Sequence, residues 1–186
     1  MIQTFLVCTA VVALGEIGDK TQLLSLMLAA RYRRPSAIIG GIALATLANH
    51  ALAGVVGNFV QRTLSPELLR WLVAAAFFAV ALWALKPDTL DDEPRTGVSS
   101  MNVLMITATA FFLAEMGDKT QVATVLLAAR FQSLIAVVLG TTAGMLLADV
   151  PVVLFGNAAA TRLPLKTVRI VAAVLFAALG VLTLLA

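Results

Sequence analysis

Glu16-Ile17-Gly18-Asp19-Lys20-Thr21-Gln22 occurs a second time, 99 residues later, as Glu115-Met116-Gly117-Asp118-Lys119-Thr120-Gln121. Six of the seven residues are identical in the two copies, and three of those six are charged. The same offset aligns Leu28-Ala29-Ala30-Arg31 with Leu127-Ala128-Ala129-Arg130 without a gap. A biased composition can match scattered leucines and alanines by chance, but it does not explain a repeated charged heptad. The chain therefore contains an internal repeat, which predicts a fold of two similar halves.

The composition places both heptads in a membrane protein. Of the 186 residues, 61% are hydrophobic and 12% are charged, and the mean hydropathy is +0.99. A soluble domain carries about 25% charged residues. One transmembrane helix takes roughly 20 apolar residues, so six of them would leave only roughly 60 residues for loops and ends. Soluble enzyme domains and nucleic-acid-binding modules are therefore excluded, and the expected surroundings are a lipid bilayer.

Six apolar stretches predict an all-α integral membrane protein with six transmembrane helices. Polar residues interrupt the first and fourth stretches at the heptads. The segment 87–100 contains two prolines and several acids, which predicts an acidic linker between three-helix repeats at 1–86 and 101–186. The stretches run from about 2–30, 35–60, 68–85, 101–129, 133–157 and 165–185.

An odd number of spans in each repeat predicts that the two halves have opposite orientations in the membrane. This inverted-repeat plan is typical of secondary transporters. Cytoplasmic loops carry an excess of Lys and Arg, so the more basic side should be cytoplasmic, with the linker there and both termini outside. The N-terminus has no basic region before its apolar run, so we expect a retained first helix in a multi-pass protein of the inner cell membrane. Loops after spans one, three and five hold Arg31, Arg33, Arg34, Lys86, Arg95, Arg162, Lys166 and Arg169, against Arg62, Arg70 and Arg130 after spans two and four.

Both heptads are expected near the bilayer midplane. Asp19 precedes Arg31 by 12 residues, which is roughly 18 Å along a helix, and half of the hydrocarbon core is about 15 Å thick. Charges at that depth are costly and usually functional. Intrahelical pairs at i and i+4, such as Glu16 with Lys20, offer a purely structural explanation. That explanation leaves the aspartates unpaired and does not account for the repetition.

A cation site explains the charges better. Glu16 and Asp19 are spaced to share one helix face, as are Glu115 and Asp118, so four carboxylates converge if the halves pack motif against motif. Oxygen ligands favour a hard divalent ion such as Ca²⁺ or Mn²⁺. Gly18 and Gly117 would either unwind the helix or allow close helix packing. The possible supporting residues are Lys20, Thr21, Gln22, Lys119, Thr120 and Gln121.

Two further polar residues lie in apolar stretches and are related by the same 99-residue offset. His50 is the only histidine, and its partner in the repeat is Asp149. They would relay protons or line the cation path, or else form a polar packing pair near a helix end. Asp149 is the stronger candidate, because an isolated acid within a membrane has few structural explanations.

The heptads resemble the Glu-x-Gly-Asp-(Lys/Arg)-(Thr/Ser) motif of the Gdt family, membrane proteins of the Golgi and of bacteria that exchange Mn²⁺ or Ca²⁺ for protons. The resemblance covers the whole chain, with one complete motif in each half. It implies that Glu16, Asp19, Glu115 and Asp118 are the functional carboxylates. It also implies a secondary transporter and not an enzyme, with the divalent cation as substrate, protons as counter-ion and no cofactor. The choice between Mn²⁺ and Ca²⁺ stays open.

Two alternative functions compete with cation export. An exporter of a cationic organic solute is disfavoured by the few aromatic residues and the compact cluster of acids. An intramembrane aspartyl protease uses a Gly-x-Gly-Asp motif, but here Glu16 and Glu115 replace its first glycine. A lysine follows each aspartate, and a cation there opposes the proton that a catalytic pair of aspartates must share.

Overall fold

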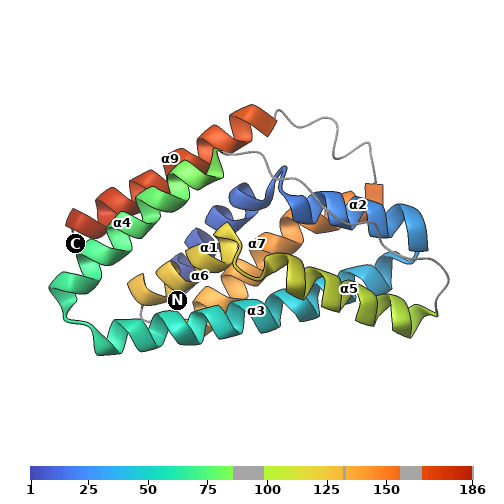
Figure 1. Cartoon of the computed structure of the whole chain (residues 1–186), viewed down its shortest axis with the longest axis horizontal. Helices are drawn as coiled ribbons and strands as arrows, with labels where there is room; N and C mark the ends of the chain where they lie inside the picture. The colour runs from blue at the N-terminus through green and yellow to red at the C-terminus, as the bar shows by residue number, and fades with distance from the viewer. Residues whose placement is uncertain (86–98, 132, 156–164, 186) are drawn as a thin grey trace.

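The computed structural model describes residues 1–85, 99–131, 133–155 and 165–185, and all regular elements in them are helices (Figure 1). This confirms the all-α prediction. The linker at 87–100 lies largely outside the described residues. The helices are α1 (Ile2–Glu16), α2 (Lys20–Tyr32), α3 (Pro35–Thr63), α4 (Pro66–Ala84), α5 (Ser100–Glu115), α6 (Lys119–Arg130), α7 (Leu134–Phe155) and α9 (Leu165–Leu185).

The described helices identify a multi-pass membrane protein. Three of them, α3, α4 and α7, are long and apolar enough to cross a bilayer. The pairs α1–α2 and α5–α6 also pass that test when each is counted as one bent span, which gives up to five candidate spans. Helix α9 coincides with the sixth expected stretch, and its segment Ile170–Leu185 is apolar but shorter. The count of six spans therefore stays a prediction.

Both bent pairs break at the heptads. The axes turn by 73° between α1 and α2, and again by 73° between α5 and α6. Gly18 and Gly117 have φ angles of 82° and 74°, in the left-handed region that glycine enters without steric cost. Of the two roles considered for these glycines, unwinding the helix is the one the structure adopts.

The helix break shows that one prediction from the sequence, a shared helix face for Glu16 and Asp19, is wrong. Glu16 and Asp19 do not share a face of one helix, because α1 ends at Glu16 and α2 begins at Lys20. Asp19 instead caps α2, since its Oδ1 accepts a hydrogen bond of 2.7 Å from the backbone N–H of Lys20. Asp118 caps α6 through the backbone N–H of Thr120. The caps satisfy backbone donors that a helix start leaves unpaired.

Each half packs its first helix against the other half, α1 against α7 and α5 against α3 (Figure 1). Glycines at Gly41 and Gly140 allow this approach, because a glycine has no Cβ and lets two helices come close together. A Cβ at Gly140 would lie 2.6 Å from the backbone O of Phe5 and 2.9 Å from the Cβ of Cys8. A Cβ at Gly41 would lie 2.7 Å from the backbone O of Leu104 and 2.6 Å from the Cβ of Thr107. Each residue of one contact is 99 positions from its counterpart in the other.

Candidate cation site at the two helix breaks

Three of the four predicted carboxylates come together where the two breaks meet. Glu16, Asp19 and Asp118 each place one carboxylate oxygen within 4.8 Å of the others. All three are buried, with exposed fractions of 0%, 1% and 2%. Two helix breaks from opposite halves thus form one acidic cluster, which agrees with the expectation that the halves pack motif against motif.

Glu115 lies outside this group of three but occupies the position equivalent to Glu16. A threonine five residues later orients each glutamate: Thr21 Oγ1 donates to Glu16 Oε2 at 2.6 Å, and Thr120 Oγ1 donates to Glu115 Oε2 at 3.0 Å. The other oxygen of each glutamate, Oε1, is buried and has no hydrogen-bond partner among the described residues. Each glutamate therefore has one fixed oxygen and one available to a ligand.

The lysines pair across the two motifs. Lys20 Nζ lies 2.8 Å from Asp118 Oδ1, and Lys119 Nζ lies 2.8 Å from Asp19 Oδ2. The intrahelical pairing of Glu16 with Lys20 is therefore not the arrangement that forms, because the helix breaks between these two residues. Lys119 is 4% exposed at its side chain and Lys20 is 22% exposed. Each aspartate is thus neutralised by a cation from the other half.

The two glutamines hold the breaks in shape. Gln22 Oε1 accepts a hydrogen bond of 2.8 Å from the backbone N–H of Gly18, and Gln121 Oε1 accepts one of 2.7 Å from the N–H of Gly117. Gln22 Nε2 also donates to the backbone O of Ala148 on α7 at 2.8 Å. The amide oxygens of these two possible supporting residues thus accept hydrogen bonds from the backbone of the unwound segments.

Asp149 is connected to the first break through α2. It is fully buried on α7 and accepts a hydrogen bond of 2.8 Å from Ser25 Oγ, while its Oδ2 has no hydrogen-bond partner among the described residues. Ser25 was not singled out from the sequence, and its only signal is a hydroxyl one turn beyond the motif, as at Thr124 in the repeat. A buried acid with one open oxygen, beside the α2 end of the break, suits proton or cation transfer.

His50 is also fully buried, on α3. Neither of its ring nitrogens has a hydrogen-bond partner among the described residues. Its neighbour Asn49 donates from Nδ2 to the backbone O of Phe112 at 3.0 Å, which ties α3 to α5. No hydrogen bond among the described residues connects the imidazole to the acidic cluster, so His50 has less structural support than Asp149.

The arrangement can hold and exchange cations. Four buried carboxylates and two ammonium groups carry a formal charge of −2, and the cluster presents oxygen as its ligand atom. Such a set suits a hard divalent cation. The two lysines already stand where positive charge is needed, so an incoming ion competes with them.

Comparison with known proteins agrees with this chemistry. The chain is 51% identical, over 92% of its length and 86% of the relative's, to a protein of Vibrio cholerae serotype O1 named "Putative manganese exporter". It is 27% identical to GDT1-like protein sll0615 of Synechocystis, over 95% of this chain and 94% of the relative. It is 26% identical to GDT1-like protein 5 of Arabidopsis thaliana, over 100% and 96%. No solved structure gives a significant match.

The model of one protein family matches both halves of the chain. It is described as the divalent cation/proton antiporter GDT1, and it matches residues 4–92 and 103–186. The matched segments contain both heptads, and the family consists of transporters and not of enzymes. This chain belongs to the GDT1 family of divalent cation/proton antiporters.

Proposed function

We propose that the protein exports Mn²⁺ from the cytoplasm in exchange for protons, and that the acidic cluster at the two helix breaks is its ion site. The observation that carries the proposal is the approach of Glu16, Asp19 and Asp118 to within 4.8 Å of one another in a buried position. Glu115 completes the set as a fourth carboxylate that the ion engages during part of the cycle. Cation binding offsets the cost of burying this charge.

Mn²⁺ is the favoured ion, and Ca²⁺ is the second candidate. The relative with 51% identity is named as a manganese exporter, and the two ions share a preference for oxygen ligands. Ca²⁺ takes six to eight oxygens at longer distances. The described cluster offers three carboxylates, with its threonines and glutamines already engaged, so it suits an ion that needs fewer ligands.

The proposed topology is two inverted three-helix repeats, 1–86 and 101–186, in the inner cell membrane with both termini outside. The mirrored contacts of Gly41 and Gly140 support it, because an exchange of the two halves maps one contact onto the other. That relation is a two-fold pseudo-symmetry. With three spans in each half, the axis lies in the membrane plane. The eight basic residues against three favour the stated orientation.

The lysines would take part in the exchange. In the absence of metal, Lys20 and Lys119 neutralise the aspartates of the opposite motif. A divalent ion bound to the same carboxylates repels both ammonium groups and displaces them. Protons that reach the carboxylates from the outside release the metal, and the halves then rock to expose the site on the other side.

Uptake into proteoliposomes tests this function. Inside-out vesicles with an acidic lumen should accumulate Mn²⁺ faster than Ca²⁺, Mg²⁺ or Zn²⁺, and the accumulation should stop when a protonophore dissipates the pH gradient. The Asp118→Asn variant provides the matched inactive control. Equal uptake with and without the gradient would contradict antiport. Counterflow of a cationic amino acid without metal uptake would favour the organic-solute alternative.

A further inference from the structure

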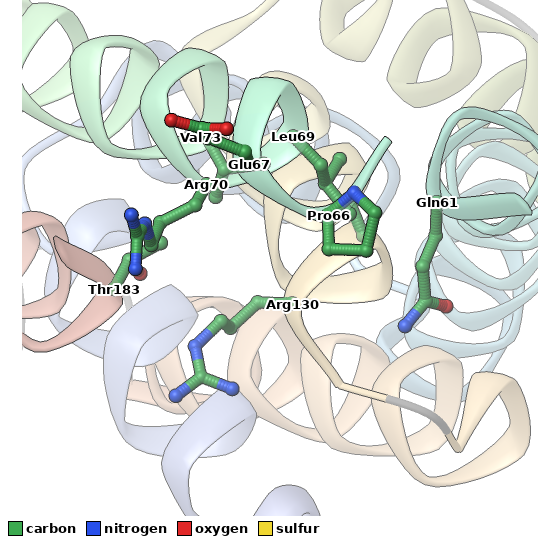
Figure 2. A pocket seen from close by; sticks show the side chains of 9 residues that line it. Gln61, Pro66, Glu67, Leu69, Arg70, Val73, Arg130 and Thr183 are labelled. Carbon is green, nitrogen blue, oxygen red and sulfur yellow. The ribbon is translucent and has the colours of Figure 1, made fainter. Parts of the chain in front are cut away.

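A cavity of about 630 Å³ lies where α3 and α6 end, α4 begins and α9 ends, and no residue of either motif lines it (Figure 2). Two arginines from different halves reach it, Arg70 from α4 and Arg130 from α6. Leu69 and Val73 contribute apolar wall beside them. This cavity is a site that the cation function does not use.

The two guanidinium groups have no anionic partner within the described parts of the chain. Neither Arg70 nor Arg130 forms a salt bridge there. The Nε of Arg70 is buried and has no hydrogen-bond acceptor in the described residues. The guanidinium of Arg130 lies 5.8 Å from the ring centroid of Phe131, a contact that leaves its N–H donors available.

Among the described lining residues one is an acid, and it does not neutralise this charge. Glu67 belongs to the first turn of α4, and in Figure 2 its carboxylate points away from Arg130. Gln61 and Thr183 add neutral polar groups to the lining. The hydroxyl of Thr183 already donates to the backbone O of Leu179. The described lining therefore offers the N–H donors of two arginines and a net positive charge.

We infer that this cavity binds a phosphate group. Guanidinium groups donate paired hydrogen bonds to phosphate oxygens in a fixed geometry, and a buried Nε–H donor without an acceptor calls for one from outside the chain. A phospholipid headgroup and free inorganic phosphate share this chemistry. Trp71, next to Arg70 in α4, is 57% exposed, and tryptophans are enriched at the membrane interface, where lipid headgroups lie.

Native mass spectrometry of the full chain in a phosphate-free detergent tests the inference. Phosphatidylglycerol is added to the unmodified protein and to Arg70→Gln, Arg130→Gln and the matched control Arg62→Gln, an exposed arginine outside the cavity. Binding should weaken about tenfold in each cavity variant, as expected for the loss of charge-assisted hydrogen bonds, and stay unchanged in the control. Arg70→Lys should weaken binding less, which keeps the test valid if Arg70→Gln does not fold.

Two further ligands identify the source of the phosphate. Diacylglycerol, which has the same tails without phosphate, should bind the unmodified protein more weakly and equally in all variants. Inorganic phosphate is then titrated against bound phosphatidylglycerol. Competition shows that free phosphate also enters the cavity. An absence of competition shows that the cavity binds the phosphate group of the lipid alone. Equal binding of phosphatidylglycerol and diacylglycerol, or an equal loss in Arg62→Gln, would overturn the inference.

Discussion

The ammonium group of Lys119, in the second motif, lies 2.8 Å from the carboxylate of Asp19, in the first. The aspartate is 1% exposed and the lysine is 3% exposed, so this ion pair is one of the contacts that join the two halves at their centre. The equivalent pair of Lys20 with Asp118 has the same length but a more exposed lysine. The proposed metal must therefore compete with charges that the protein itself supplies.

Lys20→Met and Lys119→Met should bind Mn²⁺ roughly tenfold more tightly and transport it more slowly. Without the ammonium group, the aspartate carboxylate is free to bind the metal. The empty site then carries more negative charge, which opposes its exposure on the other side of the membrane. A tenfold change is about 1.4 kcal/mol, less than the roughly 4 kcal/mol between unit charges 4 Å apart at an effective dielectric constant of 20. Calorimetric titration in detergent and initial uptake rates measure the two effects. Weaker binding in both variants would show that the lysines orient the aspartates instead of competing with the ion.

Neutralisation of the acids should abolish transport but affect stability unequally. Glu16→Gln, Asp19→Asn, Glu115→Gln and Asp118→Asn each remove one proposed ligand. Asp19→Asn also breaks a buried ion pair and should lower the free energy of unfolding by up to about 3–5 kcal/mol. Glu16→Gln should cost little, because Glu16 Oε1 has no hydrogen-bond partner among the described residues. Thermal unfolding in detergent and Mn²⁺ uptake give both values. Full transport by any two of the four variants would refute a site of four carboxylates.

Gly117→Ala should destabilise the second break by about 1–2 kcal/mol, the cost of a left-handed φ for a residue with a Cβ. No atom lies within 4 Å of a Cβ at this position, so the effect reports backbone conformation alone. Gly117→Asn should cost less, because asparagine tolerates this region better. Gly40→Ala is the control, since Gly40 lies within α3 and a Cβ there makes an ordinary 3.4 Å contact with Leu104. The loss of thermal stability should be largest in Gly117→Ala, smaller in Gly117→Asn and smallest in Gly40→Ala. An unchanged thermal stability in Gly117→Ala would argue against the break.

Inverted repeats predict that Arg31→Cys and Arg130→Cys react with a membrane-impermeant maleimide from opposite sides. The background is Cys8→Ala, which removes the one native cysteine of the chain. Labelling of intact spheroplasts and of inside-out vesicles separates the two faces, with Arg31 on the cytoplasmic side. Reaction of both cysteines from one side would contradict the topology.

The charge of the site predicts electroneutral exchange of one metal ion for two protons. Four carboxylates and two lysines carry −2, which one divalent ion or two protons on the carboxylates bring to zero. A neutral site crosses the low-dielectric region at lower cost than a charged one. Mn²⁺ uptake should therefore follow an imposed pH gradient and respond little to a potassium diffusion potential at symmetric pH. Equal uptake under either force would show that a further group, such as Asp149 or His50, adds a proton to the cycle.

The unbroken helices were predictable from the apolar stretches to within a few residues, whereas the first and fourth stretches each form two helices. The stretch expected at 35–60 is α3 at Pro35–Thr63, and the one expected at 165–185 is α9. The sequence does not decide between a helix break and close helix packing at Gly18, because glycine suits both equally well. The spacing of Asp19 and Gln22 carries a further signal, since it matches the start of a capped helix.

The pairing within the site was less predictable. The sequence predicts that all four acids converge if the halves pack motif against motif, and the structure brings three of them, Glu16, Asp19 and Asp118, together. The spacing of Glu16 and Lys20 also allows an intrahelical pair. The helix turns by 73° between these residues, and Lys20 pairs with Asp118 instead. Contacts between halves depend on how the helices cross, which local spacing does not encode. The hydroxyl of Ser25 beside Asp149 is a case of the same kind.

The mirrored contacts of Gly41 and Gly140 have a consequence for the origin of the chain. A polypeptide of three helices that inserted in both orientations would make these same contacts with a second copy of itself. Neither copy alone would form the complete ion site, because the lysine of each motif pairs with the aspartate of the other motif. A homodimer of such a half would be the smallest assembly that brings Asp19 and Asp118 of the two motifs together, and fusion of its two copies would leave each free to diverge.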